Sequence, residues 1–123
     1  MDYGLWIFRD DEFGEPIYAE PASEDVERSL WTALCEIALE AFEGDAARTG
    51  VQSAGEWNVG WKFHSKSGLS FVVAADQDLP SGEVKEFLDE LVQRYFDEVD
   101  DVRFPEADGV EDIVVDVIPP WEQ

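Results

Sequence analysis

The stretch from Ser67 to Phe96, SGLSFVVAADQDLPSGEVKEFLDELVQRYF, carries the strongest structural pattern in this chain. Residues 69–75 are apolar apart from Ser70 and show no alternation, which is typical of a strand that is covered on both faces. After Pro80, apolar residues recur at steps of three and four, as on the buried side of an amphipathic helix: Val84, Phe87, Leu88, Leu91, Val92, Tyr95, Phe96 and Val99. The stretch therefore predicts a buried strand that leads into a core-facing helix.

The acidic loop between this strand and this helix invites a search for a metal site. Asp76 and Asp78 match the D-x-D with which calcium-binding loops open. The pattern fails afterwards, because Pro80 stands at the fifth position and the closing acid falls on Phe87. We interpret the loop as a plain connection with Ser81 as the helix N-cap, and we expect no metal site.

The N-terminal part of the chain predicts a hairpin followed by a long helix. Residues 3–9, YGLWIFR, are typical of a buried strand, and residues 17–19 offer a brief second strand. A helix is predicted over residues 23–43, with Ser23 as its N-cap and Gly44 as its stop. Its apolar side combines residues at helical spacing: Val26, Leu30, Trp31, Leu34, Cys35, Ile37, Ala38, Ala41 and Phe42.

The middle of the chain, residues 51–76, predicts a three-stranded meander. In EWNVGWKFHS, apolar and polar residues alternate, so one aromatic face and one polar face are expected. A first strand is predicted around residues 51–54, and SKSG at residues 65–68 is a short hairpin loop. Near the end of the chain, residues 113–118 predict a short extra strand that two prolines stop.

Charge is the most unusual property of the composition. The chain has 123 residues, which suits one domain with a single core. Thirty acidic residues against eight basic ones give a formal net charge of −22, which disfavours nucleic acids and anionic membranes as partners. Three explanations stay open: adaptation to a high-salt cytoplasm, as in a halophile, a face complementary to a basic partner, or an ordinary solvated surface.

Several features favour a cytoplasmic protein. No apolar run approaches the ~20 residues that span a bilayer, so we expect no insertion in a membrane. MDYGLWIFRDD lacks the basic segment of a signal peptide. Cys35 is the only cysteine, so no internal disulfide forms, and we interpret it as a small apolar residue on the buried side of a helix.

Residue patterns for catalysis are thin. His64 is the only histidine, and its place in the polar phase of a strand near a turn predicts a solvated side chain. Neither G-x-x-x-x-G-K-[ST] nor G-x-G-x-x-G occurs, so no phosphate-binding loop is expected. Adjacent carboxylates carry no information in a chain with thirty acids. We therefore expect no enzyme activity and no cofactor.

The order of the predicted elements is hairpin, long helix, three-strand meander and long helix. This order resembles that of longin domains and their profilin-like and roadblock relatives. The stretch quoted first is similar to the longin passage from the last central strand into the second helix, and LWIFRD is similar to the first longin strand. The resemblance covers residues 3–99, with residues 100–123 as a C-terminal extension of a single longin-like domain over residues 1–123.

This resemblance implies an α+β fold with a five-stranded antiparallel sheet and a helix on each face. It also implies a non-catalytic role, since longin-like domains serve in trafficking proteins and, with their roadblock relatives, often bind small GTPases. No family binding residue maps onto this chain by motif. Longins usually continue with a further helix, so the strand predicted at residues 113–118 departs from their pattern. Residues 3–9 and 69–75 are the most apolar runs, and we expect them to pair antiparallel at the sheet centre.

Two hypotheses for function follow. The first is a protein-interaction module, as a monomer or homodimer, that binds or regulates a small GTPase or a trafficking-type assembly. Its candidate partner-binding residues are Trp57, Trp61 and Trp121, because tryptophan is enriched at interface hot spots; packing on the sheet is the alternative for the first two. The second is an acidic inhibitor, such as an immunity protein that neutralises a basic nuclease-type toxin.

Overall fold

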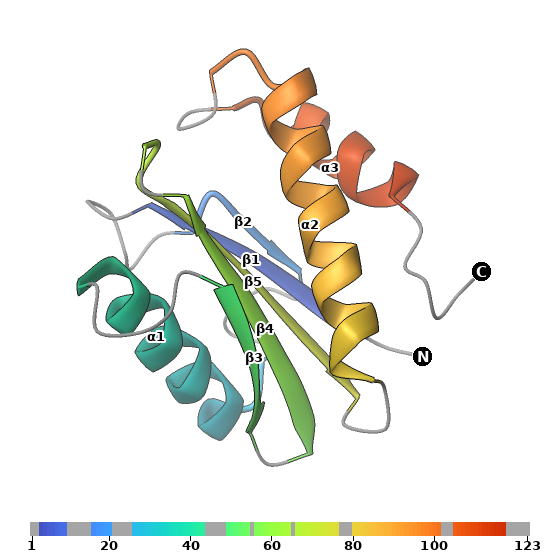
Figure 1. The fold of residues 1–123 in the computed structure, drawn as a ribbon. Helices are drawn as coiled ribbons and strands as arrows, with labels where there is room; N and C mark the ends of the chain where they lie inside the picture. Colours follow the sequence, from blue (N-terminus) through green and yellow to red (C-terminus); the bar gives the residue numbers. More distant parts are fainter. Residues whose placement is uncertain are drawn as a thin grey trace.

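The computed structural model describes residues 3–9, 16–20, 26–43, 49–54, 56–64, 66–76, 80–101 and 105–117. Its elements follow the order β1 (Tyr3–Arg9), β2 (Tyr18–Glu20), α1 (Arg28–Glu43), β3 (Thr49–Ala54), β4 (Trp57–His64), β5 (Leu69–Asp76), α2 (Ser81–Glu98) and α3 (Ala107–Asp116). The five strands form one antiparallel sheet in the order β2-β1-β5-β4-β3 (Figure 1). The expected α+β fold with a five-stranded antiparallel sheet is confirmed.

β1 and β5 lie side by side in the interior of the sheet. Their register runs from Tyr3 opposite Ala75 to Arg9 opposite Leu69, and β2 and β4 flank the pair. The predicted antiparallel pairing of these two strands is therefore confirmed. Both strands are mostly apolar on both sides because their side chains alternate between two sheet faces, each of which is covered by helix.

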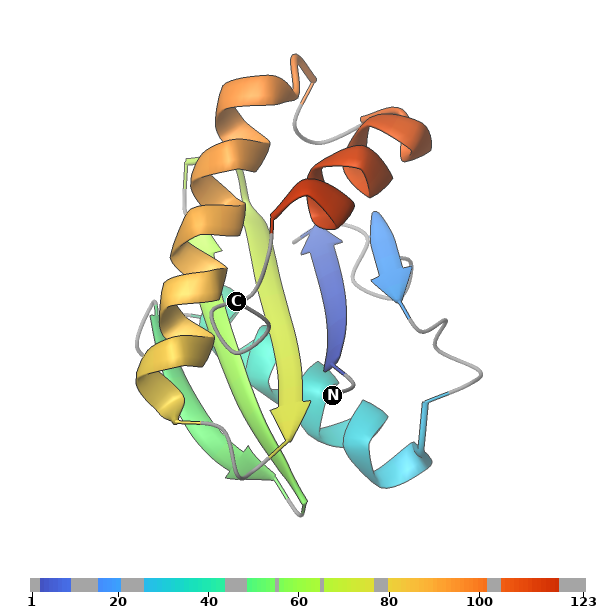
Figure 2. The ribbon, with the colours of Figure 1, turned by 90° about the vertical axis from the view of Figure 1, so that its right-hand side faces the viewer.

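Helices cover both faces of the sheet (Figures 1 and 2), and each face carries a separate core. On one, called here the α2/α3 face, the sheet packs against α2 and α3 through buried residues: Leu5, Ile7, Leu69, Phe71, Val73, Ala75, Val84, Phe87, Leu88, Leu91, Val92, Tyr95, Val110, Ile113 and Val117. On the other, the α1 face, the sheet packs against α1 through a second set: Trp6, Phe8, Leu30, Leu34, Ile37, Ala38, Val59, Trp61, Val72 and Ala74.

The start of α1 differs from the prediction. The helix begins at Arg28, and its first backbone bond runs from Trp31 N–H to the carbonyl of Glu27 at 2.9 Å. Val26 precedes the helix but still packs against the core of the α1 face, which explains why it matched the helical spacing. The predicted cap Ser23 and stop Gly44 lie outside the described residues.

Two further boundaries are corrected. Ser81 is the first residue of α2 rather than its cap, because Pro80 occupies the N-cap position and no side chain caps the helix there. The short strand predicted at residues 17–19 is shifted by one residue to Tyr18–Glu20. Ile17 precedes it and donates its N–H to the carbonyl of Ile7 at 2.7 Å.

The extra C-terminal strand predicted at residues 113–118 is wrong. Residues up to Asp116 of this segment belong to the helix α3, and Ile118 lies outside the described residues. Val110, Ile113 and Val117 are buried in the core of the α2/α3 face, at helical steps of three and four. The β-branched run suggested a strand, but the apolar spacing that includes Val110 matches a helix.

Two remaining expectations concern the β4–β5 turn and the membrane. Gly68 takes a positive φ of 72°, as expected for a glycine in a hairpin loop. Its N–H bonds to the carbonyl of His64 at 2.9 Å. Among the described residues, no helix has the length and apolar character to cross a membrane.

Candidate functional site

The tryptophans proposed as partner-binding residues are largely used in packing. Trp61 is only 8% exposed and belongs to the core of the α1 face. Trp57 is half-buried and packs against the same core. Trp121 lies outside the described residues. For Trp61, the structure thus agrees with packing on the sheet.

The polar side of β4 is covered by α2. Lys62 pairs with Asp89 of α2, with Nζ and Oδ1 3.1 Å apart. The His64 ring lies against Phe96, with ring centroids 4.3 Å apart. His64 is half-buried, so the expectation of a solvated histidine is wrong. The alternation of β4 is real, but its second face meets a helix rather than water.

His64 also contacts a serine in its own turn. Its Nδ1 lies 2.8 Å from Ser67 Oγ and accepts the Ser67 backbone N–H at 3.3 Å. The Ser67 hydroxyl also donates to the His64 carbonyl at 3.3 Å. A serine nucleophile needs a histidine that a third group orients, and no described carboxylate contacts this ring. These bonds close the β4–β5 hairpin.

The remaining candidates for reactivity are the cysteine and groups of acidic side chains that could bind a metal ion. Cys35 is half-buried on α1, and burial raises the pKa of its thiol, which disfavours the reactive thiolate. No group of three or more His, Cys, Asp or Glu side chains in the described ranges is arranged to hold a metal ion. Asp78 lies outside those ranges.

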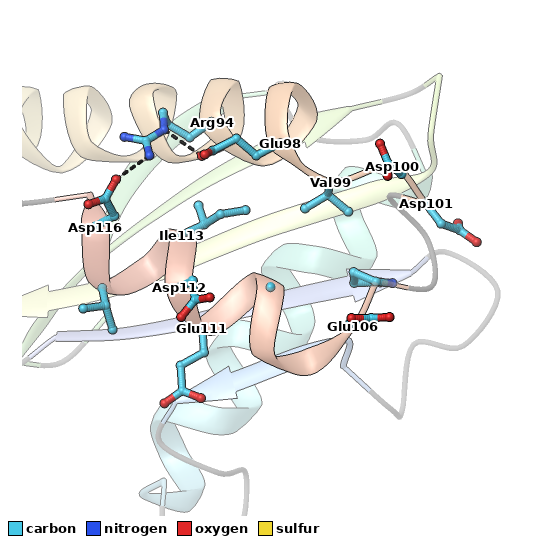
Figure 3. A pocket seen from close by; sticks show the side chains of 13 residues that line it. Arg94, Glu98, Val99, Asp100, Asp101, Glu106, Glu111, Asp112, Ile113 and Asp116 are labelled. Carbon is cyan, nitrogen blue, oxygen red and sulfur yellow. Dashed lines mark hydrogen bonds and ion pairs between the residues drawn. The ribbon is translucent and has the colours of Figure 1, made fainter.

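A groove between the end of α2 and α3 is the most distinctive surface of the described residues (Figure 3). Its volume is about 880 Å³. Val99, which ends α2, and Ile113 of α3 contribute apolar side chains that also contact the core of the α2/α3 face. Val115, also on α3, is 75% exposed and is one of only two large apolar side chains exposed in the described ranges, with Leu39 of α1.

Acidic side chains dominate the lining of this groove. Among the described residues that line it, seven carboxylates and one guanidinium give a formal charge of −6. The charged groups are Arg94, Glu98, Asp100, Asp101, Glu106, Glu111, Asp112 and Asp116. An acidic surface that also exposes apolar atoms can attract and hold a basic protein surface.

Arg94 connects the two helices at one end of this groove. Its Nε bonds to Glu98 one turn along α2 at 2.8 Å, and its Nη2 bonds to Asp116 of α3. Hydrogen bonds to these carboxylates raise the pKa of Arg94 above its ordinary value. Figure 3 shows Asp100 and Asp101 at the opposite end of the groove from Arg94. In the described part of the chain, Asp100, Glu106, Glu111 and Asp112 form no ion pair, so these four carboxylates are available to solvent or a partner.

Sequence reasoning missed the groove because it misassigned α3. The charges were visible, but with a strand predicted at residues 113–118, nothing indicated that carboxylates of this segment share a surface with those that follow α2. The spacing of Val110, Ile113 and Val117 was the signal that could have found the helix. Once α3 packs beside α2, its acidic side chains and those that follow α2 share one surface.

The sequence matches no protein-family model and no curated protein.

Proposed function

We propose that this protein is a non-catalytic interaction module of the cytoplasm that binds a basic surface of a partner protein. The observation that carries the proposal is the groove between α2 and α3, whose described lining holds seven carboxylates and one guanidinium. Such a surface speeds association with a cationic partner through long-range attraction. The exposed side chain of Val115 at the same groove offers an apolar contact that salt does not screen.

A basic nuclease-type toxin is the partner class that the charge favours. An acidic inhibitor occupies the site where such an enzyme binds phosphates, so its carboxylates replace the charges of the nucleic acid. The net charge of −22 and the acidic groove both support this role. In this case affinity and association rate fall steeply as salt is added.

A small GTPase or a trafficking-type assembly is the second partner class. It is supported by the order of elements that resembles longin domains. The helix α3 adds support, because longins usually continue with a helix at this point of the chain. In this case binding depends on the nucleotide state of the GTPase rather than mainly on salt.

The aromatic patch of Trp57, Trp61 and Trp121 now has less support than the acidic groove. Trp61 is too buried to present its ring to a partner without a change in the core. Trp57 keeps a partly accessible side chain. Truncation of Trp57 therefore tests the remaining part of that hypothesis.

A matched pair of variants tests the role of the groove. Asp100→Asn/Glu111→Gln/Asp112→Asn removes three exposed carboxylates of the groove. Glu36→Gln/Glu40→Gln/Glu43→Gln removes three exposed carboxylates of α1, on the opposite side of the sheet, and changes the net charge equally. Each variant is compared with the wild-type protein for binding to a purified basic nuclease and to a purified small GTPase, at low and molar salt.

We expect the groove variant to slow association with the basic nuclease far more than the α1 variant does. Equal slowing by the two variants would mean that net charge alone acts and would remove the groove from the proposal. Binding to the GTPase alone, only in its GTP state, would select the second partner class. Binding to neither protein would contradict both.

A further inference from the structure

The two edges of the sheet are built very differently. β2, at one edge, has only three residues, ends in Glu20 and is preceded by Pro16. β3, at the other edge, has six residues and pairs with β4 alone among the described elements (Figure 1). Every second residue of an antiparallel edge strand turns its N–H and C=O outward. Those groups of β3 have no partner in the described part of the chain.

β3 also lacks the usual protection of an edge strand. Natural proteins block open edges with charged side chains, proline, bulges or very short strands. β3 has the sequence TGVQSA, which contains neither a charge nor a proline, although 31% of the residues in the chain are charged. Its pairing with β4 is continuous over all six residues, so it contains no bulge. The edge is therefore open to strand addition.

Apolar groups of both cores reach this edge. Val51 packs against the core of the α2/α3 face. On the α1 face, the indole of Trp61 lies over Gly50, where a Cβ would meet Trp61 Cζ2 at 2.7 Å. A strand added beside β3 extends both layers, and its side chains alternate between the side of Val51 and the side of the indole.

Charge indicates which kind of strand fits this edge. The helices on both faces of the sheet expose more acidic than basic side chains: Glu36, Glu40 and Glu43 against Arg28 on α1, and Glu86, Glu90 and Asp97 against Lys85 on α2. A second copy of the chain would bring the same acidic helices and its own charge of −22 to the contact. A strand with basic side chains is attracted instead.

We propose that β3 is a docking edge for an extended, lysine- or arginine-bearing segment of a partner protein, which adds as a sixth strand. This inference rests on the proposed role as a binding module for a basic partner, but it concerns a surface other than the groove. Backbone hydrogen bonds to β3 hold the segment, and its alternate basic side chains face the acidic helices.

A synthetic peptide tests this inference without knowledge of the partner. The probe alternates lysine with valine and is about as long as β3. Its control has the same sequence with N-methyl groups on alternate amides, which keep the charge but remove the donors needed for strand pairing. Binding is measured by titration, and amide hydrogen exchange locates it on the protein.

We expect the unmethylated peptide to bind about tenfold tighter or more than its control, and to slow amide exchange within residues 49–54. Equal binding of the two peptides, or binding of neither, would overturn the proposal. So would loss of peptide binding in the Asp100→Asn/Glu111→Gln/Asp112→Asn variant, since the peptide would then occupy the groove. A dimer of the protein alone that excludes the peptide would assign the edge to a second copy.

The same measurements separate this inference from the proposed function. If the groove variant binds a basic nuclease as well as the wild type does while the peptide still protects β3, the groove proposal fails and the edge proposal stands. If the groove variant fails to bind the basic nuclease and the peptide does not protect β3 from exchange, the edge proposal fails and the groove proposal stands.

Discussion

The two faces of the sheet solve the same packing problem in different ways. One helix covers the α1 face, and four of the five tryptophans, Trp6, Trp31, Trp57 and Trp61, belong to its core or pack against it. Two helices cover the α2/α3 face, whose core is mostly aliphatic and, in the part of the chain that the structure describes, contains no tryptophan. Trp121 lies outside the described residues. Among the described residues, the tryptophan rings thus lie on the face that one helix covers rather than on the face that two helices cover.

Interior volume explains this difference. Protein cores are filled to nearly constant density, so a face that a single helix covers needs larger side chains from the sheet. Small residues make room for the rings: a Cβ on Gly4 would meet the indole of Trp6 at 2.3 Å. The high tryptophan content of this short chain therefore has a structural explanation, and it is weak support for an aromatic interface.

Truncation of Trp61 is the strongest test of this comparison. Trp61→Ala removes a nearly buried ring from the α1 face and should lower the free energy of unfolding by about 3–5 kcal/mol. Val115 lies on α3, and its side chain is 75% exposed. Val115→Ala should therefore change the free energy of unfolding by less than about 0.5 kcal/mol. Urea unfolding measures both. Unchanged stability of Trp61→Ala together with lost partner binding would restore Trp61 as an interface residue.

Glycines on the two faces should respond in opposite directions to a methyl group. In Gly50→Ala, the new Cβ would lie 2.7 Å from Trp61 Cζ2, so we expect a loss of about 1–3 kcal/mol. In Gly109→Ala in α3, the new Cβ would meet no described atom within 4 Å, so this variant should stabilise the protein by up to about 1 kcal/mol. Thermal or urea unfolding compares them. If Trp61→Leu does not relieve the loss in Gly50→Ala, the contact with the indole is not its cause.

Alkaline pH should lower the stability of the protein through Tyr95, which lies in the core of the α2/α3 face. Tyr95 is 1% exposed, and burial raises the pKa of its phenol above the ordinary value. Unfolded chains ionise tyrosine near pH 10 while the folded protein keeps this phenol neutral, so stability falls as pH rises past about 10. The slope that this one group contributes is at most about 1.4 kcal/mol per pH unit. Unfolding between pH 8 and 11 should therefore show a flatter decline in Tyr95→Phe, and an identical decline would contradict the assignment.

The centre of the fold was predictable because its pattern is local. Residues 3–9 and 69–75 are apolar on both strand faces, which leaves the interior of a sheet as the only place to bury them. The register of β1 with β5 then brings these runs together along their full length. The edges were less predictable, because a short strand such as β2 depends on its neighbour rather than on its own pattern.

The candidate site was less predictable because it depends on tertiary packing. Arg94 and Asp116 are separated by 22 residues, and nothing local indicates that they meet. The β-branched residues Ile113, Val114 and Val115 also favoured a strand locally, although α3 gains more by burying Val110, Ile113 and Val117. Packing decided the conformation of this segment, and with it the position of the acidic groove.

Removal of a single charge should have the smallest effect on stability, and added salt should reduce that effect. Arg94→Gln removes the one cation among the described residues of the groove, together with its bonds to Glu98 and Asp116, so these two carboxylates lose their counter-charge. Lys85→Gln on α2 changes the net charge equally, but Lys85 is exposed and forms no ion pair in the described part of the chain.

At low salt, we expect Arg94→Gln to lower the melting temperature more than Lys85→Gln does. In molar KCl the difference between the variants should shrink, because salt screens the repulsion among exposed carboxylates. The wild type should itself gain stability as KCl is added, if its charge of −22 is an adaptation to brine. Equal melting temperatures of the two variants at low salt would mean that the groove carries no special repulsion. The acidity would then act only as a general property of the surface, and the groove would lose its distinction from the helix α1 on the other face.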